Sequence, residues 1–117
     1  MEPAGELIVE KTEAAWLLRL RGEWDTANSP TLTAELEAVF AHGTRVLIDL
    51  RETTFLDSAV LGAIVLGRTR ASRKADDGLV VVSPPGSWPR RLLDTVGFPG
   101  LVPVYDDIDA GLAAFRS

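Results

Sequence analysis

Two short segments that are apolar along nearly their whole length constrain this fold most: RVLIDL at residues 45–50 and GLVVVS at residues 78–83. A strand that is apolar on both faces is typical of the buried interior of a parallel sheet. A helical apolar pattern lies between the two segments, and parallel strands joined through a helix form a crossover unit. The sequence therefore predicts an α/β domain built around these two strands.

The N-terminal part predicts a pair of strands followed by a helix. Residues 7–11 (LIVEK) and 15–21 (AWLLRLR) are apolar runs separated by a polar break, as in a hairpin. Pro30 is typical of a first helical residue, which makes Ser29 the expected N-cap. The apolar spacing over residues 30–42 is that of an amphipathic helix, ended by a glycine.

The C-terminal part alternates in the same way. Helices are expected over residues 58–74, 87–96 and 108–115, and residues 51–57 are interpreted as a connection. Residues 101–105 form a short strand, placed at a sheet edge because Pro103 lacks an N–H donor. The prediction is a mixed, mostly parallel sheet of about four to five strands with about four helices.

Length and charge narrow the class of protein further. The 117 residues are expected to form a single domain, with its core at about residues 7–115. The chain has no cysteine, which excludes disulfides and thiolate metal sites, and its net charge of −5 argues against a nucleic-acid partner. No apolar run reaches the ~20 residues of a membrane span, and no signal pattern begins the chain. We therefore expect a cytoplasmic protein without membrane insertion.

The motifs give no positive sign of an enzyme. A nucleophilic Ser58 would need a base, but the one histidine, His42, ends the first predicted helix at the opposite sheet edge. Neither a G-x-S-x-G elbow nor a phosphate-binding glycine loop occurs. The acidic pairs at residues 76–77 and 106–107 are expected to be solvated turns and helix starts. No cofactor and no metal are expected.

The segment TFLDSAVLGAI (residues 54–64) places a carboxylate and a hydroxyl between two apolar runs. Ser58 is either a helix N-cap or part of a polar pair, with Asp57, that is presented at the helix tip as a switchable spot. The two readings are compatible. The helix that follows is apolar nearly all round, so neighbouring elements cover both sides or part of it is exposed for a partner. The remaining face carries only small residues, which favours docking: Ala59, Gly62 and Ala63.

These residues resemble the STAS domain family, and in particular the stand-alone bacterial anti-sigma-factor antagonists. Four segments carry the resemblance in order: LRGEWDTANSPTL, RVLIDLRETTFLDSAVLGAI, GLVVVSPPGSWPRRLLDTVGF and LVPVYDDIDAGLAAF. Together they cover essentially the whole chain, from residue 7 to residue 115. The most specific part is an apolar strand, a short polar break and then FLDS-x-x-LG.

The resemblance implies a binding switch that regulates transcription. Such proteins bind an anti-sigma factor, often one with a histidine-kinase-like ATPase fold, and so release a sigma factor. The anti-sigma factor phosphorylates the serine after the aspartate, here Ser58, and a PP2C-type phosphatase removes the phosphate. The unpaired N–H groups of the helix N-terminus would tolerate that charge, so its effect would appear at the interface. The expected partner-binding residues are Asp25, Thr26, Asn28, Asp57, Ser58, Ala59, Val60, Gly62, Ala63 and Leu66.

The chain departs from the family's usual D-S-S-G-L-G at two positions. Ala59 removes the second hydroxyl and leaves Ser58 alone at the tip. Val60 replaces a glycine and is expected to add bulk where a partner backbone would approach. Among the tryptophans, Trp16 is expected in the core, while Trp24 and Trp88 are expected at the surface.

Three other functions remain open at this stage. One is a STAS adaptor subunit of a transporter or of a multi-protein signalling assembly, without phosphorylation. Another is a small enzyme or nucleotide binder, which no motif supports. The last is a constitutive decoy, in which Val60 has abolished recognition by the kinase.

Overall fold

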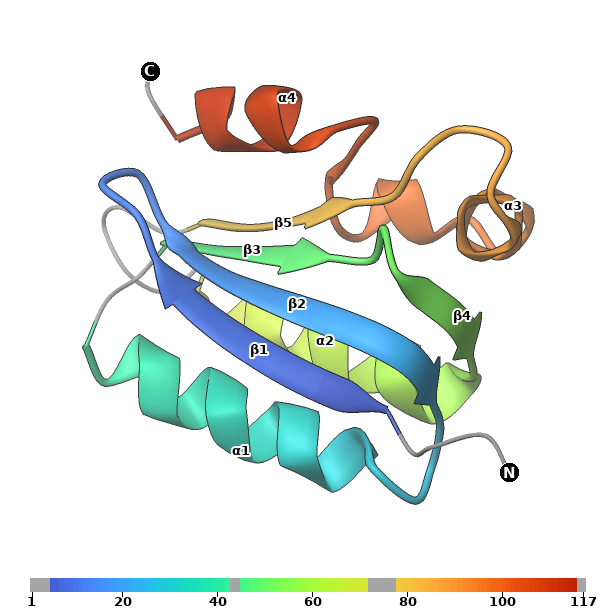
Figure 1. The fold of residues 1–117 in the computed structure, drawn as a ribbon, viewed down its shortest axis with the longest axis horizontal. Coiled ribbons are helices and arrows are strands. Elements are labelled where there is room, and N and C mark those ends of the chain that lie inside the picture. Colours follow the sequence, from blue (N-terminus) through green and yellow to red (C-terminus); the bar gives the residue numbers. More distant parts are fainter. Residues whose placement is uncertain (1–4, 43–44, 72–77, 116–117) are drawn as a thin grey trace.

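The computed structural model describes residues 5–42, 45–71 and 78–115, and within them the chain forms one α/β domain. Figure 1 shows the arrangement. The elements, in chain order, are β1 (Glu6–Lys11), β2 (Trp16–Trp24), α1 (Ser29–Phe40), β3 (Arg45–Asp49), β4 (Thr53–Leu56), α2 (Ser58–Ala71), β5 (Gly78–Val82), α3 (Trp88–Thr95), a 3-10 turn (Phe98–Gly100), β6 (Val104–Tyr105) and α4 (Ile108–Ala113).

The sheet is mixed and mostly parallel, as predicted. Its strand order is β1-β2-β3-β5-β6; β1 pairs with β2 antiparallel, and the other pairs are parallel. The two apolar segments became the central strands β3 and β5, and β6 lies at an edge, as Pro103 indicated. The predicted α/β class is confirmed.

The sheet contains one strand, β4, that the sequence reading had treated as a connection. It pairs parallel with the last part of β2, where the register shifts between Gly22 and Glu23. Gly22 has φ +79°, a conformation that side chains with a Cβ rarely adopt. The bend lets β2 leave β3 and take β4 as its neighbour. Thr53 fastens the start of β4 through its hydroxyl, which donates to the Leu20 carbonyl oxygen at 2.6 Å.

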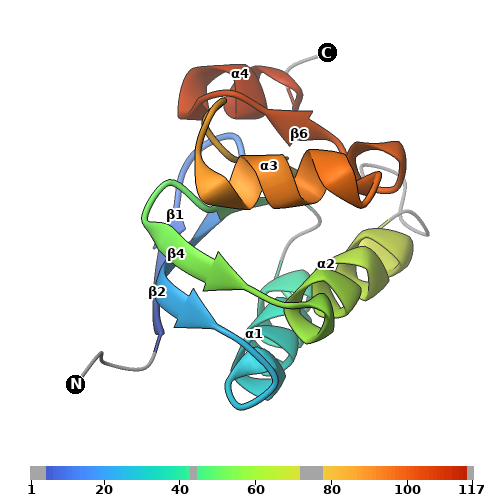
Figure 2. The same ribbon diagram turned by 90° about the vertical axis from the view of Figure 1, so that its right-hand side faces the viewer.

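Helices cover both faces of the sheet, as Figures 1 and 2 show. On one face α1 and α2 pack side by side, and the larger apolar cluster combines their side chains with those of β2, β3 and β5. On the other face α4 covers β3 and β5 through a smaller cluster that includes Leu47, Val82 and Phe115. The short helix α3 lies beside β4.

Within the described residues, helix boundaries differ from the predictions by at most two residues. The residue before α1 is Asn28, so the prediction of Ser29 as N-cap is wrong; Ser29 is already helical. The first predicted helix ends at residue 40, and its expected glycine stop lies outside the described residues. So do residues 72–74 of the next predicted helix and the acidic pair at residues 76–77. Asp107 begins α4 as expected and accepts from the Ala110 N–H at 2.8 Å.

One of the three tryptophans lies in a different place from the one predicted. Trp24 is fully buried rather than at the surface, and its Nε1–H donates to the Arg21 carbonyl oxygen at 3.1 Å. Trp16 is half-buried beside the core cluster, and Trp88 is exposed. Burial of Trp24 closes the core at the end of β2, directly under the loop that leads to α1.

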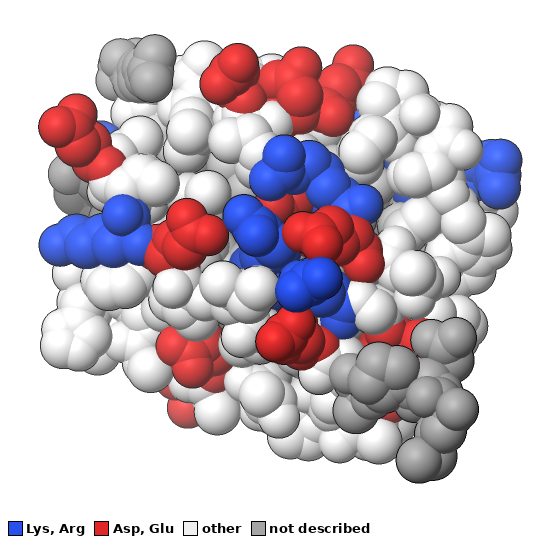
Figure 3. Space-filling model, viewed as in Figure 1, with Lys and Arg blue, Asp and Glu red and all other residues white. Residues whose placement is uncertain are grey.

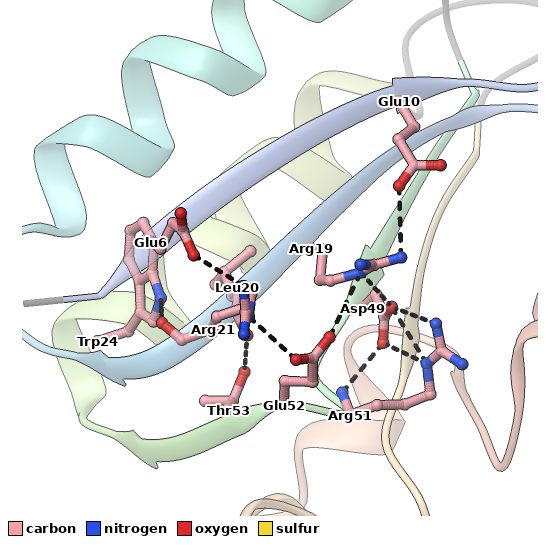
Figure 4. A network of polar contacts seen from close by, with 10 residues as sticks. All are labelled: Glu6, Glu10, Arg19, Leu20, Arg21, Trp24, Asp49, Arg51, Glu52 and Thr53. Carbon is pink, nitrogen blue, oxygen red and sulfur yellow. Dashed lines mark hydrogen bonds and ion pairs between the residues drawn. The ribbon is translucent and has the colours of Figure 1, made fainter.

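The part of the sheet face that α4 leaves open carries alternating charges, visible as interleaved blue and red groups in Figure 3. Figure 4 shows their pairing. Arg21 lies 3.0 Å from both Glu6 and Glu52 (Nη1 to Oε1 and Nε to Oε2). Arg19 contacts Glu10, Asp49 and Glu52 at 3.3–3.7 Å. These basic groups are therefore neutralised locally.

Asp49 is the buried centre of this network, at 1% exposure. Its carboxylate accepts from the Arg51 backbone N–H at 3.0 Å and pairs with the Arg51 guanidinium at 2.9 Å. The hydrogen bond to Asp49 is the main reason that the pKa of Arg51 is raised above its ordinary value. The network thus fastens the β3–β4 turn and fixes where β4 begins.

No helix within the described residues is long and apolar enough to cross a membrane.

Candidate functional site

The polar pair of the sequence lies where two parallel strands end side by side. β2 leads into the loop of residues 25–28, and β4 leads into Asp57 and α2. Figure 2 shows β4 running directly into α2, with the β2–α1 loop beside it. Because parallel strands have their carboxyl ends at the same edge, residues far apart in the sequence meet here. The site therefore has two halves, the loop and the tip of α2.

Asp57, not Ser58, caps α2. Its Oδ1 accepts from the backbone N–H groups of Ala59 and Val60, at 3.0 and 3.2 Å. The prediction of Ser58 as N-cap is therefore wrong by one residue. Aspartate and serine cap about equally well, so local preference does not choose between them. The loop distinguishes them, because Asp57 also accepts hydrogen bonds from Thr26 through its other oxygen.

The second oxygen of Asp57 binds the loop. Oδ2 accepts from the backbone N–H of Thr26 at 3.0 Å and from its hydroxyl at 3.2 Å. One carboxylate thus receives four hydrogen bonds, two from each half of the site. Bonds to a charged acceptor are stronger than neutral ones, so Asp57 is the connection between the two halves.

The loop is ordered by its own hydrogen bonds. Asp25 Oδ1 accepts from the Ala27 N–H at 2.9 Å, and Asn28 Oδ1 accepts from the Asp25 N–H at 2.8 Å. The Asn28 amide donates to the Glu23 carbonyl oxygen at 2.9 Å, which fixes the loop to β2. Asp25, Thr26 and Asn28 therefore belong to one ordered loop, which contacts Asp57 through Thr26.

Ser58 is the first residue of α2 and is exposed. Among the described residues, no group hydrogen-bonds to its hydroxyl. The N–H groups of residues 59 and 60, which were expected to be unpaired, are already bound to Asp57. A phosphate on Ser58 would meet an occupied helix N-terminus with a carboxylate beside it.

The surface of α2 is partly covered and partly open. Val60 is 0% exposed, so the prediction that it adds bulk at the surface is wrong; its side chain fills the core. Gly62 is exposed and faces open space, and Ala59 and Ala63 are half-buried. Leu66 is 46% exposed at a shallow groove between α1 and α2. One side of the apolar helix is therefore covered by neighbouring elements, and another part of it is exposed.

A stacked aromatic pair lies next to the tip and was missed in the sequence. Phe55 of β4 and Trp88 of α3 are 39% and 41% exposed, with ring centroids 5.6 Å apart and planes at 19°. The signal that could have found Phe55 is the run TTFL, once it is taken as a strand whose buried Leu56 leaves Phe55 facing outward.

The histidine lies away from this site, as predicted. His42 is exposed and lines a surface hollow with Lys11, Trp16 and Arg45, at the starting ends of β2 and β3. Ser58 follows the far end of β4. In the described residues, no three metal-binding side chains lie together.

Comparison with known proteins places this geometry in a family. A family model described as "Mlab, STAS domain" matches residues 7–103, most of the chain. The chain belongs to the STAS domain family. The tip of α2 in this STAS domain is the segment that the sequence likeness had singled out.

Individual relatives agree with this assignment. The Bordetella bronchiseptica protein BtrV, which carries the name of an anti-sigma factor antagonist, is 27% identical over 113 residues, 96% of each chain. The crystal structure of an anti-sigma factor antagonist from Mycobacterium paratuberculosis is 26% identical, with a TM-score of 0.81 over 97% of this chain and 96% of that one. The Bacillus cell fate determinant SpoIIAA in its phosphorylated form is 20% identical, with a TM-score of 0.65 over 97% and 100%.

Proposed function

We propose that this STAS domain is an anti-sigma-factor antagonist whose binding is switched off by phosphorylation of Ser58. Two relatives of about this length that bear that name, at 26% and 27% identity, support the general role. The partner is an anti-sigma factor with serine-kinase activity, and a PP2C-type phosphatase reverses the modification. The STAS domain itself acts by binding, in the cytoplasm, without cofactor or catalysis.

The proposed docking surface combines the loop with the exposed side of α2. It contains the polar residues of both halves and the small and apolar residues of the helix: Asp25, Thr26, Asn28, Asp57, Ser58, Ala59, Gly62, Ala63 and Leu66. Small side chains let a partner backbone approach closely, and the exposed Leu66 provides apolar area to bury. Val60 is left out because its side chain is in the core.

Ser58 is the proposed phosphoacceptor because its hydroxyl is exposed and uncommitted. The nearby hydroxyl of Thr26 is held by Asp57. In the transfer, Ser58 Oγ bonds to the γ-phosphorus of ATP, the bond to ADP breaks and the kinase takes the hydroxyl proton. Hydrolysis by the phosphatase returns serine and inorganic phosphate. A phosphorylated form of SpoIIAA is known, and that protein is named an anti-sigma factor antagonist.

The geometry explains how the phosphate would oppose docking. It adds about 1.5 to 2 negative charges. Asp57 already occupies the N–H groups of residues 59 and 60, so the added charge meets a carboxylate rather than free donors. Both charges must lose water when a partner covers the tip. A loss of about 1.4 kcal/mol lowers affinity tenfold, so even a modest penalty switches the complex.

The uncommitted hydroxyl of Ser58 beside Asp57 carries this proposal, and affinity capture from host lysate tests it. The baits are wild type, Ser58→Ala, Ser58→Asp and, as a matched charge control on the same helix, Thr69→Asp. The proposal expects one histidine-kinase-like ATPase on all baits except Ser58→Asp, and phosphate on Ser58 of the wild type. Retention of that ATPase by Ser58→Asp would contradict it.

A second candidate is an unphosphorylated adaptor subunit of a transporter or signalling assembly. The family model is described as "Mlab, STAS domain" and not as an anti-sigma factor antagonist, so it supports the STAS domain that both candidates share. Here Ser58 has no regulatory role. The same capture distinguishes the two, since all four baits would then hold one transporter or scaffold subunit and no phosphate would be found on Ser58.

A further inference from the structure

The two halves of the candidate site are joined through one side chain. The hydrogen bonds that run from the loop to α2 both end on Asp57 Oδ2, and both come from Thr26. The remaining side-chain bonds of the loop stay within it or run to β2. The position of the loop relative to the tip therefore depends on a contact between residues that lie 31 positions apart.

We infer that Thr26 is a positioning residue that holds Asp57 in place and couples the loop to the state of Ser58. Phosphorylation of Ser58 releases this contact, so the partner loses the loop together with the tip. The regulatory meaning of this coupling rests on the proposed function, whereas the coupling itself is a property of the isolated chain.

The physical reason is competition for the same donors. The phosphate of residue 58 carries three acceptor oxygens at the first position of the helix. The backbone N–H groups of Ala59 and Val60, which follow it in the first turn, are both bound to Asp57 Oδ1. If these two N–H groups bind the phosphate instead, Asp57 loses its hydrogen bonds to the start of α2. If Asp57 keeps them, two anions stand side by side and repel each other. In the first case Asp57 leaves the helix tip, and in the second the repulsion strains its position, so in both cases its bonds to Thr26 weaken.

The hydroxyl of Thr26 contributes to this coupling separately from its backbone N–H. It provides one of the two donors on Oδ2, and valine would keep the shape of the side chain without that donor. Serine would keep the donor. Comparison of the two substitutions therefore separates the hydrogen bond from the packing of residue 26.

Amide hydrogen exchange on the isolated protein tests the coupling without a partner. Phosphoserine is introduced during synthesis at position 58 and, as a control of equal charge on the same helix, at position 69 in place of Thr69. We expect the Thr26 amide to exchange at least tenfold faster with phosphoserine at 58. Amides in the middle of α1 should stay unchanged, and the control protein should match wild type. A change of less than twofold at Thr26 would overturn the inference.

The unphosphorylated variants give an independent readout. Thr26→Val should speed exchange at the Ala59 and Val60 amides at least threefold, because Asp57 loses one of its two hydrogen bonds from the loop. Thr26→Ser should behave as wild type. If Thr26→Val leaves both amides unchanged, Thr26 does not position Asp57, and the inference fails.

The two proposals can fail separately. Faster exchange at Thr26 together with unchanged partner affinity of the phosphorylated protein would leave the coupling standing and refute the switch. Unchanged exchange at Thr26 with lost partner affinity would support the switch and refute the coupling.

Discussion

Replacing Asp57 with asparagine separates its two structural roles. As a helix cap, asparagine is about as good as aspartate, so a residue that only capped α2 would tolerate the change. In this structure the second oxygen also accepts from Thr26, at 3.0 Å from the backbone N–H and 3.2 Å from the hydroxyl. An asparagine that keeps its oxygen toward Ala59 and Val60 points its NH₂ group at those donors. The substitution therefore removes the bond from the Thr26 backbone N–H and the negative charge of the acceptor, and it leaves the cap.

The expected loss can be worked from these bonds. Hydrogen bonds to charged groups contribute about 1.5–3 kcal/mol each when well shielded, and those to Thr26 are exposed, so about 1–2 kcal/mol for the pair is reasonable. Asp57→Ala also removes the cap, which adds about 1 kcal/mol. We thus expect losses of roughly 1–2 kcal/mol for Asp57→Asn and 2–3 kcal/mol for Asp57→Ala. For a domain of this size each kcal/mol lowers Tm by about 4 °C.

Denaturant unfolding monitored by circular dichroism, together with thermal melts, measures both values. Ser58→Ala is the matched control, because its hydroxyl has no partner among the described residues, and it should stay within about 0.5 kcal/mol of wild type. If Asp57→Asn is as stable as wild type while Asp57→Ala is not, Asp57 is only a cap. That result would refute the connection between the loop and α2.

Three further substitutions test other parts of the structure by the same unfolding assay. Val60→Gly, which restores the family's usual residue, should lose about 3 kcal/mol, since it removes buried side-chain area and places glycine inside a helix. Asp49→Ala should lose about 1–3 kcal/mol, because the Arg51 backbone N–H and guanidinium lose their buried acceptor, while both arginines stay partly exposed to water. Phe55→Ala should lose about 1 kcal/mol and shift Trp88 fluorescence to longer wavelength as the indole loses its stacked neighbour.

Each of these has a result that contradicts it. A stable Val60→Gly would mean that the side chain is not packed in the core. Near-neutral Asp49→Ala would mean that the charge network does not hold the β3–β4 turn. An unchanged emission spectrum in Phe55→Ala would mean that the aromatic pair is not formed in solution.

The sequence predicted the fold class because each central strand can be recognised from its own apolar residues, without knowledge of its neighbours. The middle of β3 and all of β5 are apolar, and the helix between them makes the two strands parallel neighbours. β4 was missed for the opposite reason. It has four residues, and it is a strand only because β2 bends at Gly22 and offers it an edge. A short strand of this kind is specified by its neighbour rather than by its own sequence.

The residues of the candidate site were named from the sequence, but the bonds between them were not. Asp57 and Ser58 were named as a polar pair between two apolar runs, and Asp25 and Thr26 through the resemblance to STAS domains. Choosing the cap between Asp57 and Ser58 required the contact of Asp57 with the β2–α1 loop, which a local pattern does not give. The bonds of Thr26 to Asp57 join residues 31 apart, and no sequence spacing encodes them.

The three partners of β2 also bear on how the chain folds. β1 reaches β2 through a tight turn in which the Thr12 side chain bonds to Ala14 and Ala15, and such local hairpins form within about 1–10 μs. Pairing with β3 or β4 must first close a loop that includes α1, which is slower. We therefore expect the hairpin to form early and the end of β2, with β4 and the tip of α2, to be completed last. A partly folded chain would hold most of its sheet and still be unable to dock.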